Sequence, residues 1–170
     1  MALLLFPVVT FLCGTWWPLF QMSIDYRLAD GPRGGLTFDF IPCDHDFCGK
    51  YDYDRFGPDV FNVREEAFLF VEGLVACSFP DWSKNYRHWG TTWVARDRWL
   101  DILSGFPELR HDVRGNARLS AVVDKYVLYA GLMPRRYKFH RKALLTFLDR
   151  FEERVRIVIE HYPYLLIDGI

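Results

Sequence analysis

The chain has 170 residues with 22 acidic and 21 basic side chains, so its formal net charge at pH 7 is −1. Apolar residues make up 51% of the chain and aromatic residues 18%, which is enough to bury the core of one globular domain. This composition excludes a disordered tail, a fibrous repeat and a dense disulfide scaffold, and the balanced charge excludes a general nucleic-acid coat.

The first 24 residues carry no charged side chain, and Asp25 is the first charged one. A run of this length can span a bilayer, but two prolines and a glycine interrupt it, and it lacks the basic start and cleavage site of a signal peptide. Three interpretations stay open for residues 1–21: a membrane anchor, an apolar arm packed on the domain, or a start codon placed ahead of a true start at Met22. The globular domain is expected over residues 22–170.

Two short strands are predicted over residues 24–28 and 36–41, because apolar and polar side chains nearly alternate there. The segment between them is rich in glycine and proline, which predicts a turn, so the two strands are expected to pair as a hairpin. Residues 42–60 then form a long loop rich in Asp, Tyr and Gly, and loops of this length in compact domains tend to be functional or disordered.

A buried helix is predicted over residues 63–77, with Asn62 as its N-cap and apolar residues at helical spacing. Residues 67–71 are apolar on all sides, so a central strand remains an alternative there. The Phe79-Pro80 pair ends the element in either case.

A strand over residues 90–94 is predicted next, because Thr, Trp and Val favour extended backbone. A short helix follows, which Asp97 caps and Gly105 ends, with Pro107 just beyond it. Asn116 opens another helix with apolar residues on one face.

The last helix is predicted over residues 138–161, and a final strand over residues 164–167. The apolar stripe of this helix consists of Leu144, Phe147, Leu148, Phe151, Val155, Val158 and Ile159. Because strands precede helices rather than alternate with them, the sequence predicts an α+β fold. A small antiparallel sheet is expected to pack against about four helices, including this long amphipathic C-terminal helix.

The densest group of polar residues lies between Asp39 and Asp59. Six aspartates against only Lys50 and Arg55 give this acidic-aromatic stretch a local charge of −4, and Tyr and Phe side chains stand between the acids. Carboxylates attract a basic surface and tyrosines supply rigid contact area, so we expect a protein partner here, the alternative being an ordinary polar loop. The predicted contact residues are Asp44, Asp46, Tyr51, Asp52, Tyr53, Asp54, Phe56, Asp59 and, from the next polar loop, Trp82.

Cys43, His45 and Cys48 lie within six residues of one another, and Cys77 is a possible fourth ligand. Their spacing differs from that of the common zinc knuckles, so neither a metal nor another cofactor is predicted. The sequence also lacks the motifs of phosphate-binding loops, dinucleotide-binding turns, serine hydrolases and zinc proteases, so no catalytic residue is assigned. A hydrolase that uses a metal or a cysteine of the Cys43/His45/Cys48 loop remains the enzymatic alternative.

Residues 135–142 carry five Lys or Arg side chains and no acid, with two aromatic residues between them. This pattern can bind RNA, but the acids later in the same helix can pair with these bases, so no nucleic-acid partner is predicted. The tryptophans between residues 82 and 99 are expected mostly in the core, with Trp82 and Tyr86 available for surface contact.

The order of these features resembles that of small bacterial immunity proteins, which neutralise polymorphic or contact-dependent toxins. Beyond the acidic-aromatic stretch, the segments that carry the resemblance are Cys77-Ser78-Phe79-Pro80-Asp81, Trp89-Gly90-Thr91-Thr92, Arg98-Trp99-Leu100-Asp101-Ile102-Leu103 and Ile167-Asp168-Gly169-Ile170. The resemblance implies a cytoplasmic, non-enzymatic inhibitor that covers a cognate toxin domain, often a basic nuclease surface. A membrane-tethered accessory domain is the alternative that residues 1–21 leave open, and the oligomeric state is undetermined.

Overall fold

The computed structural model describes residues 22–32, 35–44, 57–115, 119–129, 131, 137–138 and 140–169. Within these ranges the chain forms a five-stranded antiparallel sheet, a separate two-stranded pair and six helices, which confirms the predicted α+β class. The three interpretations of residues 1–21 concern a segment outside the described residues.

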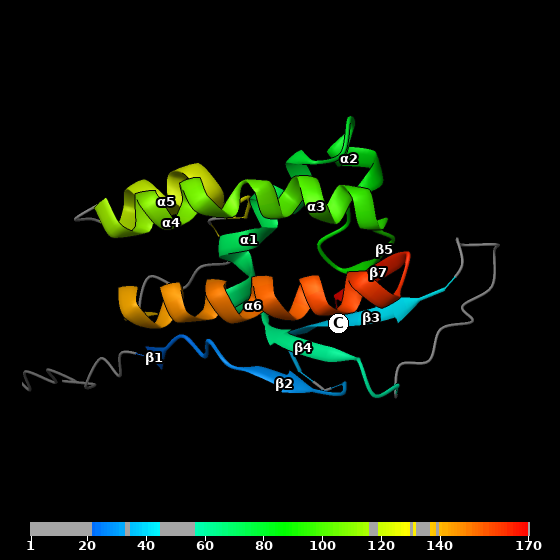
Figure 1. Ribbon diagram of the computed structural model, residues 1–170. Coiled ribbons are helices and arrows are strands. Elements are labelled where there is room, and N and C mark those ends of the chain that lie inside the picture. The colour runs from blue at the N-terminus through cyan, green and yellow to red at the C-terminus, as the bar shows by residue number, and fades with distance from the viewer. Residues whose placement is uncertain are drawn as a thin grey trace, which may run out of the picture.

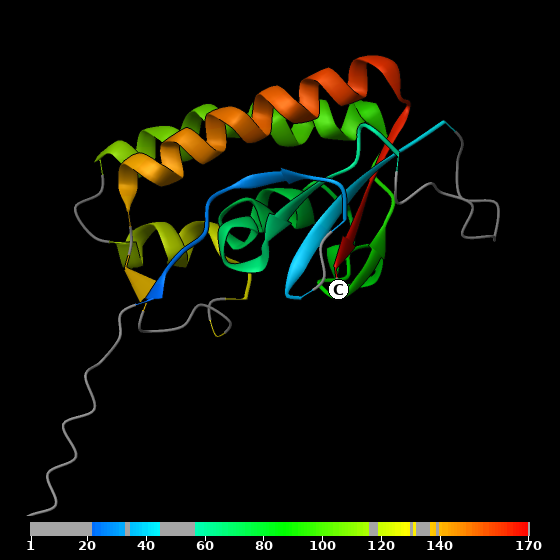
Figure 2. The same cartoon turned by 90° about the horizontal axis from the view of Figure 1, so that it is seen from below.

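The main sheet has the strand order β2-β4-β3-β7-β5, and each neighbouring pair is antiparallel. In that order the strands are β2 (Leu28–Asp30), β4 (Phe61–Arg64), β3 (Thr37–Cys43), β7 (Tyr164–Gly169) and β5 (Gly90–Thr92). A parallel pair joins β1 (Met22–Ser23) to β6 (Tyr137–Lys138), at the end of the molecule where the last helix begins (Figure 2). Because β7 lies between β3 and β5, β5 joins the rest of the sheet only through β7.

The helices are α1 (Glu65–Cys77), α2 (Trp82–Asn85), α3 (Arg96–Ser104), α4 (Phe106–Gly115), α5 (Leu119–Tyr126) and α6 (Arg141–His161). Figure 1 shows α6 running between the strands and the layer formed by α3, α4 and α5. Consistent with this view, α6 contacts β2 and β7 on one side and α3 and α4 on the other.

The core is built around the predicted stripe of α6, and all seven stripe residues are buried. The ring of Phe151 packs against the rings of Phe40, Phe61 and Phe106, with centroid distances of 5.2, 6.1 and 6.1 Å. Each buried aromatic side chain of this kind stabilises the fold by roughly 1.5–3 kcal/mol, so the stripe fixes the position of α6 on the sheet.

The predicted hairpin is wrong, because β4 lies between β2 and β3 and pairs with both. Asn62, predicted as a helix cap, lies in β4, and its side-chain amide donates hydrogen bonds to the carbonyl oxygens of Ala29 (3.3 Å) and Gly31 (2.5 Å). No turn residue separates the end of β4 from the start of α1. The sequence pattern therefore places Val63 and Arg64 in the predicted helix and does not indicate a strand before it.

The helix over residues 63–77 is confirmed against the strand alternative, but it begins at Glu65, and its N-cap Arg64 makes no side-chain capping bond. Similarly, α3 has Ala95 as its N-cap, and Asp97 lies in the first turn. Helix α4 is not predicted at all, because Pro107 in the sequence looks like a stop signal. Proline is tolerated in the first turn of a helix, where its missing N–H has no intrahelical partner in any case.

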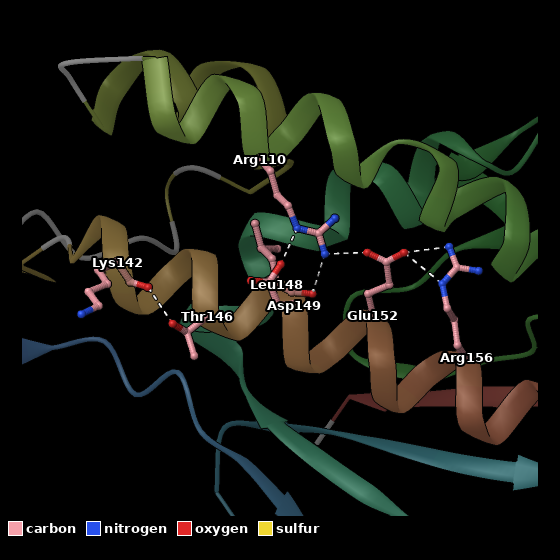
Figure 3. A network of polar contacts seen from close by, with 7 residues as sticks. All are labelled: Arg110, Lys142, Thr146, Leu148, Asp149, Glu152 and Arg156. Carbon is pink, nitrogen blue, oxygen red and sulfur yellow. Dashed lines mark hydrogen bonds and ion pairs between the residues drawn. The ribbon is translucent and has the colours of Figure 1, made fainter.

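A polar network fastens α4 to α6 (Figure 3). Arg110 donates hydrogen bonds to Asp149 (2.7 Å), to Glu152 (2.5 Å) and to the carbonyl oxygen of Leu148 (3.3 Å). Arg156 donates two more to Glu152, at 3.0 and 2.7 Å. Burial raises the pKa of Glu152, but the hydrogen bonds from Arg110 and Arg156 lower it by more, so its net pKa lies below the ordinary value. The Glu152 carboxylate is therefore a charged anchor between the two helices.

Candidate functional site

Three of the nine predicted partner-contact residues lie in the described part of the chain. Asp44 follows β3 and is exposed, and Trp82 at the start of α2 is 40% exposed. Asp59 accepts a hydrogen bond from the Tyr162 hydroxyl at 3.0 Å, and this bond raises the pKa of Tyr162, so Asp59 also serves the fold. The other six predicted contacts lie outside the described residues: Asp46, Tyr51, Asp52, Tyr53, Asp54 and Phe56.

The cysteines of the enzymatic alternative lie on different elements or fall outside the described ranges. Cys43 is buried in β3, and Cys77 is exposed at the end of α1. His45 and Cys48 lie outside the described residues. Within the ranges that the structure does describe, no three His, Cys, Asp or Glu side chains are placed to hold a metal ion.

A cluster of ionisable side chains that the sequence does not predict lies between α1 and the segment that leads into β5. Glu72, in the middle of α1, is fully buried and accepts a hydrogen bond of 2.6 Å from the Tyr86 hydroxyl. His88 is 4% exposed, and its two ring nitrogens lie 2.5 Å from Glu72 Oε1 and 2.9 Å from Glu65 Oε1. We call Glu65, Glu72, Tyr86 and His88 the Glu–His cluster.

The charges of the Glu–His cluster stabilise one another. Burial lowers the pKa of His88, but its hydrogen bonds to Glu72 and Glu65 raise it more, so the net pKa lies above the ordinary value. A protonated imidazole donates from both nitrogens, one to each carboxylate. Burial and the neighbouring Glu72 charge raise the pKa of Tyr86 far above its usual range, which keeps its hydroxyl a donor. Because both His88 nitrogens are engaged, the cluster is arranged to hold charge inside the fold.

One signal for this cluster was present in the sequence. Glu72 is the single charged residue in the run 67–76, which is predicted to be buried, and a buried carboxylate needs hydrogen-bonding partners. Nothing local to α1 indicates that these partners come from residues 86–88. The expectation of a surface role for Tyr86 is wrong, because its side chain is 3% exposed and is directed to Glu72.

The tryptophan-rich segment contributes both to the core and to a surface groove. Trp99 is fully buried, and its indole N–H donates to the carbonyl oxygen of Leu165 at 3.0 Å. Trp93 packs against Tyr164 with a centroid distance of 6.3 Å, and both rings line an open groove of about 550 Å³. This Trp93 groove is bounded by the end of α2, by β5 and by the first turn of α3, and its described lining contains Lys84, Arg87 and Arg98 and no carboxylate.

Two of the three cations in the Trp93 groove have no acidic partner among the described residues. Lys84 forms an ion pair with Asp81 at 2.6 Å. Arg98 donates instead to the carbonyl oxygen of Ser78 and lies 4.5 Å from the ring centroid of Phe79. Arg87 is exposed, and its backbone N–H donates to Thr92 Oγ1 at 3.4 Å. The groove therefore presents positive charge next to aromatic surface.

No helix in the described ranges combines the length and the apolar character needed to cross a bilayer.

No protein-family model, curated protein or solved structure matches the chain. Function is therefore inferred from the placement and chemistry of the side chains themselves.

Proposed function

We propose that this protein is a non-enzymatic protein-binding module that acts as an immunity-type inhibitor and occludes the surface of a cognate bacterial toxin. The observation that supports this function is the exposure of two predicted contact residues, Asp44 and Trp82. Asp44 directly follows β3, and Trp82 is the first residue of α2.

The ionisable groups of the described core favour binding over catalysis. Both ring nitrogens of His88 are engaged and Glu72 is fully buried, so neither side chain is presented to a substrate. Cys43 is buried within β3 and is therefore shielded from an incoming electrophile. A core whose ionisable groups are engaged with one another is a suitable scaffold for presenting contact residues.

Inhibition in this proposal is occlusion and involves no covalent chemistry. The carboxylates of the acidic-aromatic stretch steer a basic toxin face towards the molecule, and its aromatic residues supply the contacts that lose water on binding. Added salt should therefore weaken binding mainly by slowing association. The partner is expected in the same cytoplasm as the inhibitor.

The test begins with the full chain as bait for a partner from its native host, followed by titration calorimetry with the purified partner. We expect Asp52→Lys/Asp54→Lys to weaken binding by about 100-fold, because it places positive charge against a basic face. The control is Asp101→Lys/Asp124→Lys, which makes the same charge change at two exposed positions and should stay within about threefold of the original affinity.

Two outcomes would contradict the proposal. Unchanged binding by Asp52→Lys/Asp54→Lys would remove the acidic-aromatic stretch from the interface. Stoichiometric zinc in the purified protein, together with hydrolytic activity that a chelator abolishes, would assign function to the Cys43/His45/Cys48 loop instead.

A further inference from the structure

We propose that the Trp93 groove is a second binding site, which takes an acidic segment of a protein partner and places its carboxylates against Arg87 and Arg98. This site goes beyond the proposed function, since its charge is opposite to that of the acidic-aromatic stretch. It stands whether or not that stretch binds a basic toxin.

The charge balance of the groove is the first argument. Among the described arginines outside the groove, Arg27, Arg110, Arg154 and Arg156 each have an Asp or Glu partner within 3.4 Å. Arg64, Arg96, Arg114 and Arg150 have no such partner among the described residues, but none of them lines the Trp93 groove. Arg87 and Arg98 line one groove without such a partner, and Lys84 adds a third cation beside them. Like charges in one groove repel each other, so an incoming carboxylate gains from both arginines at once.

Arg98 is positioned for this role before any partner arrives. The Phe79 ring and the Ser78 carbonyl oxygen hold its guanidinium, and the carbonyl engages only Nη1. The Nε–H and Nη2–H groups remain, and together they form the edge of a guanidinium that binds a carboxylate through two parallel hydrogen bonds. Since the side chain is already fixed, less conformational entropy is lost on binding.

The shape and lining of the groove favour a peptide segment over a small molecule. Small-molecule sites are mostly enclosed and apolar, whereas this groove is open and mixes aromatic walls with polar groups of Asn85, Thr91 and Thr92. An extended segment can lay its side-chain methylenes on Trp93 while its carboxylates reach the arginines. Trp and Arg together are also the residue types that contribute most to protein–protein binding energy.

The test is titration calorimetry of the full chain with a hexaglutamate peptide blocked at both ends. A blocked hexaglutamine peptide is the neutral control, and inorganic phosphate and adenosine monophosphate represent small anions. We expect hexaglutamate to bind, hexaglutamine to show no heat of binding, and added salt to weaken the hexaglutamate complex. Failure of hexaglutamate to bind, or tighter binding of either small anion, would overturn the proposal.

Variants locate the binding. Arg87→Gln/Arg98→Gln should lower hexaglutamate affinity at least about tenfold, while Arg114→Gln/Arg150→Gln, which removes equal charge at exposed positions elsewhere, should change it by less than about twofold. Arg98→Gln also removes a contact of the fold, so the exposed Arg87→Gln alone serves as a second test, with an expected loss of about threefold. Equal losses in the two double variants, or no loss in Arg87→Gln, would refute the site. Neither result bears on Asp52 and Asp54, so the proposed function is tested separately.

Discussion

Glu72 shows how a single buried charge constrains this fold. Its carboxylate has no exposed surface and depends on Tyr86 and His88, while Glu65 on the outer side of the cluster is 14% exposed. Breaking a fully buried ion pair by removing one partner costs about 3–5 kcal/mol. We therefore expect Glu72→Gln to lower the free energy of unfolding by about 3 kcal/mol and Glu65→Gln by less than about 1.5 kcal/mol, measured by urea denaturation. Equal losses would mean that the two carboxylates share the His88 charge evenly.

His88 predicts how stability depends on pH. Its pKa in the folded protein is raised above the ordinary 6.5, so the folded state binds the proton more tightly than the unfolded chain. This stabilisation is fully present below about pH 6.5 and is lost as the pH rises through the raised pKa. The free energy of unfolding should fall across that window, and His88→Gln should flatten the fall.

Urea denaturation at intervals from about pH 6 to about pH 9 measures this dependence. His161→Gln is the matched control, because His161 is exposed, and it should leave the pH profile unchanged. A profile that is equally steep in His88→Gln and in the original protein would exclude the Glu–His cluster as its source.

At the scale of elements, Gly73 reports how closely α1 approaches the end of α5. A Cβ atom added at Gly73 would lie 2.2 Å from the carbonyl oxygen of Tyr126, whereas one added at Gly115 would meet nothing within 4 Å. Replacing glycine by alanine inside a helix normally stabilises it by up to about 1 kcal/mol. We expect Gly115→Ala to be neutral or stabilising and Gly73→Ala to destabilise by more than about 2 kcal/mol, because the backbones must separate. Thermal unfolding followed by circular dichroism distinguishes the two.

The elements also show which predictions sequence patterns support. The stripe of α6 is correct in full, because a 21-residue helix repeats one local pattern many times. The hairpin prediction fails because the pairing of β2 and β3 with β4 is decided by contacts distant in sequence. The Glu–His cluster is missed for the same reason, since Glu72 and His88 lie 16 residues apart on different elements.

On the scale of the whole molecule, β7 joins the C-terminal part of the described chain to strands that come much earlier in the sequence. The strand pairs with β3 on one side and with β5 on the other, so residues 38–43 meet residues 164–169. Such distant contacts make folding slow and cooperative, because the chain loses conformational entropy in closing a long loop before the contact forms. Circular dichroism, which reports the helices, and tryptophan fluorescence should therefore show coincident unfolding transitions.

The last prediction concerns a chain that ends at Tyr162 and lacks β7. Leu165, Leu166 and Ile167 are each at most 1% exposed, and the indole N–H of buried Trp99 donates to the Leu165 carbonyl oxygen, so removing the strand opens the centre of the sheet. We expect the shortened chain to show no cooperative unfolding transition. Because a truncated chain is also open to degradation, Leu166→Ala provides the milder test, with an expected loss of about 3 kcal/mol in urea denaturation. A shortened chain that still unfolds cooperatively, with near-native ellipticity, would show that the helices and the remaining strands form a stable core without β7.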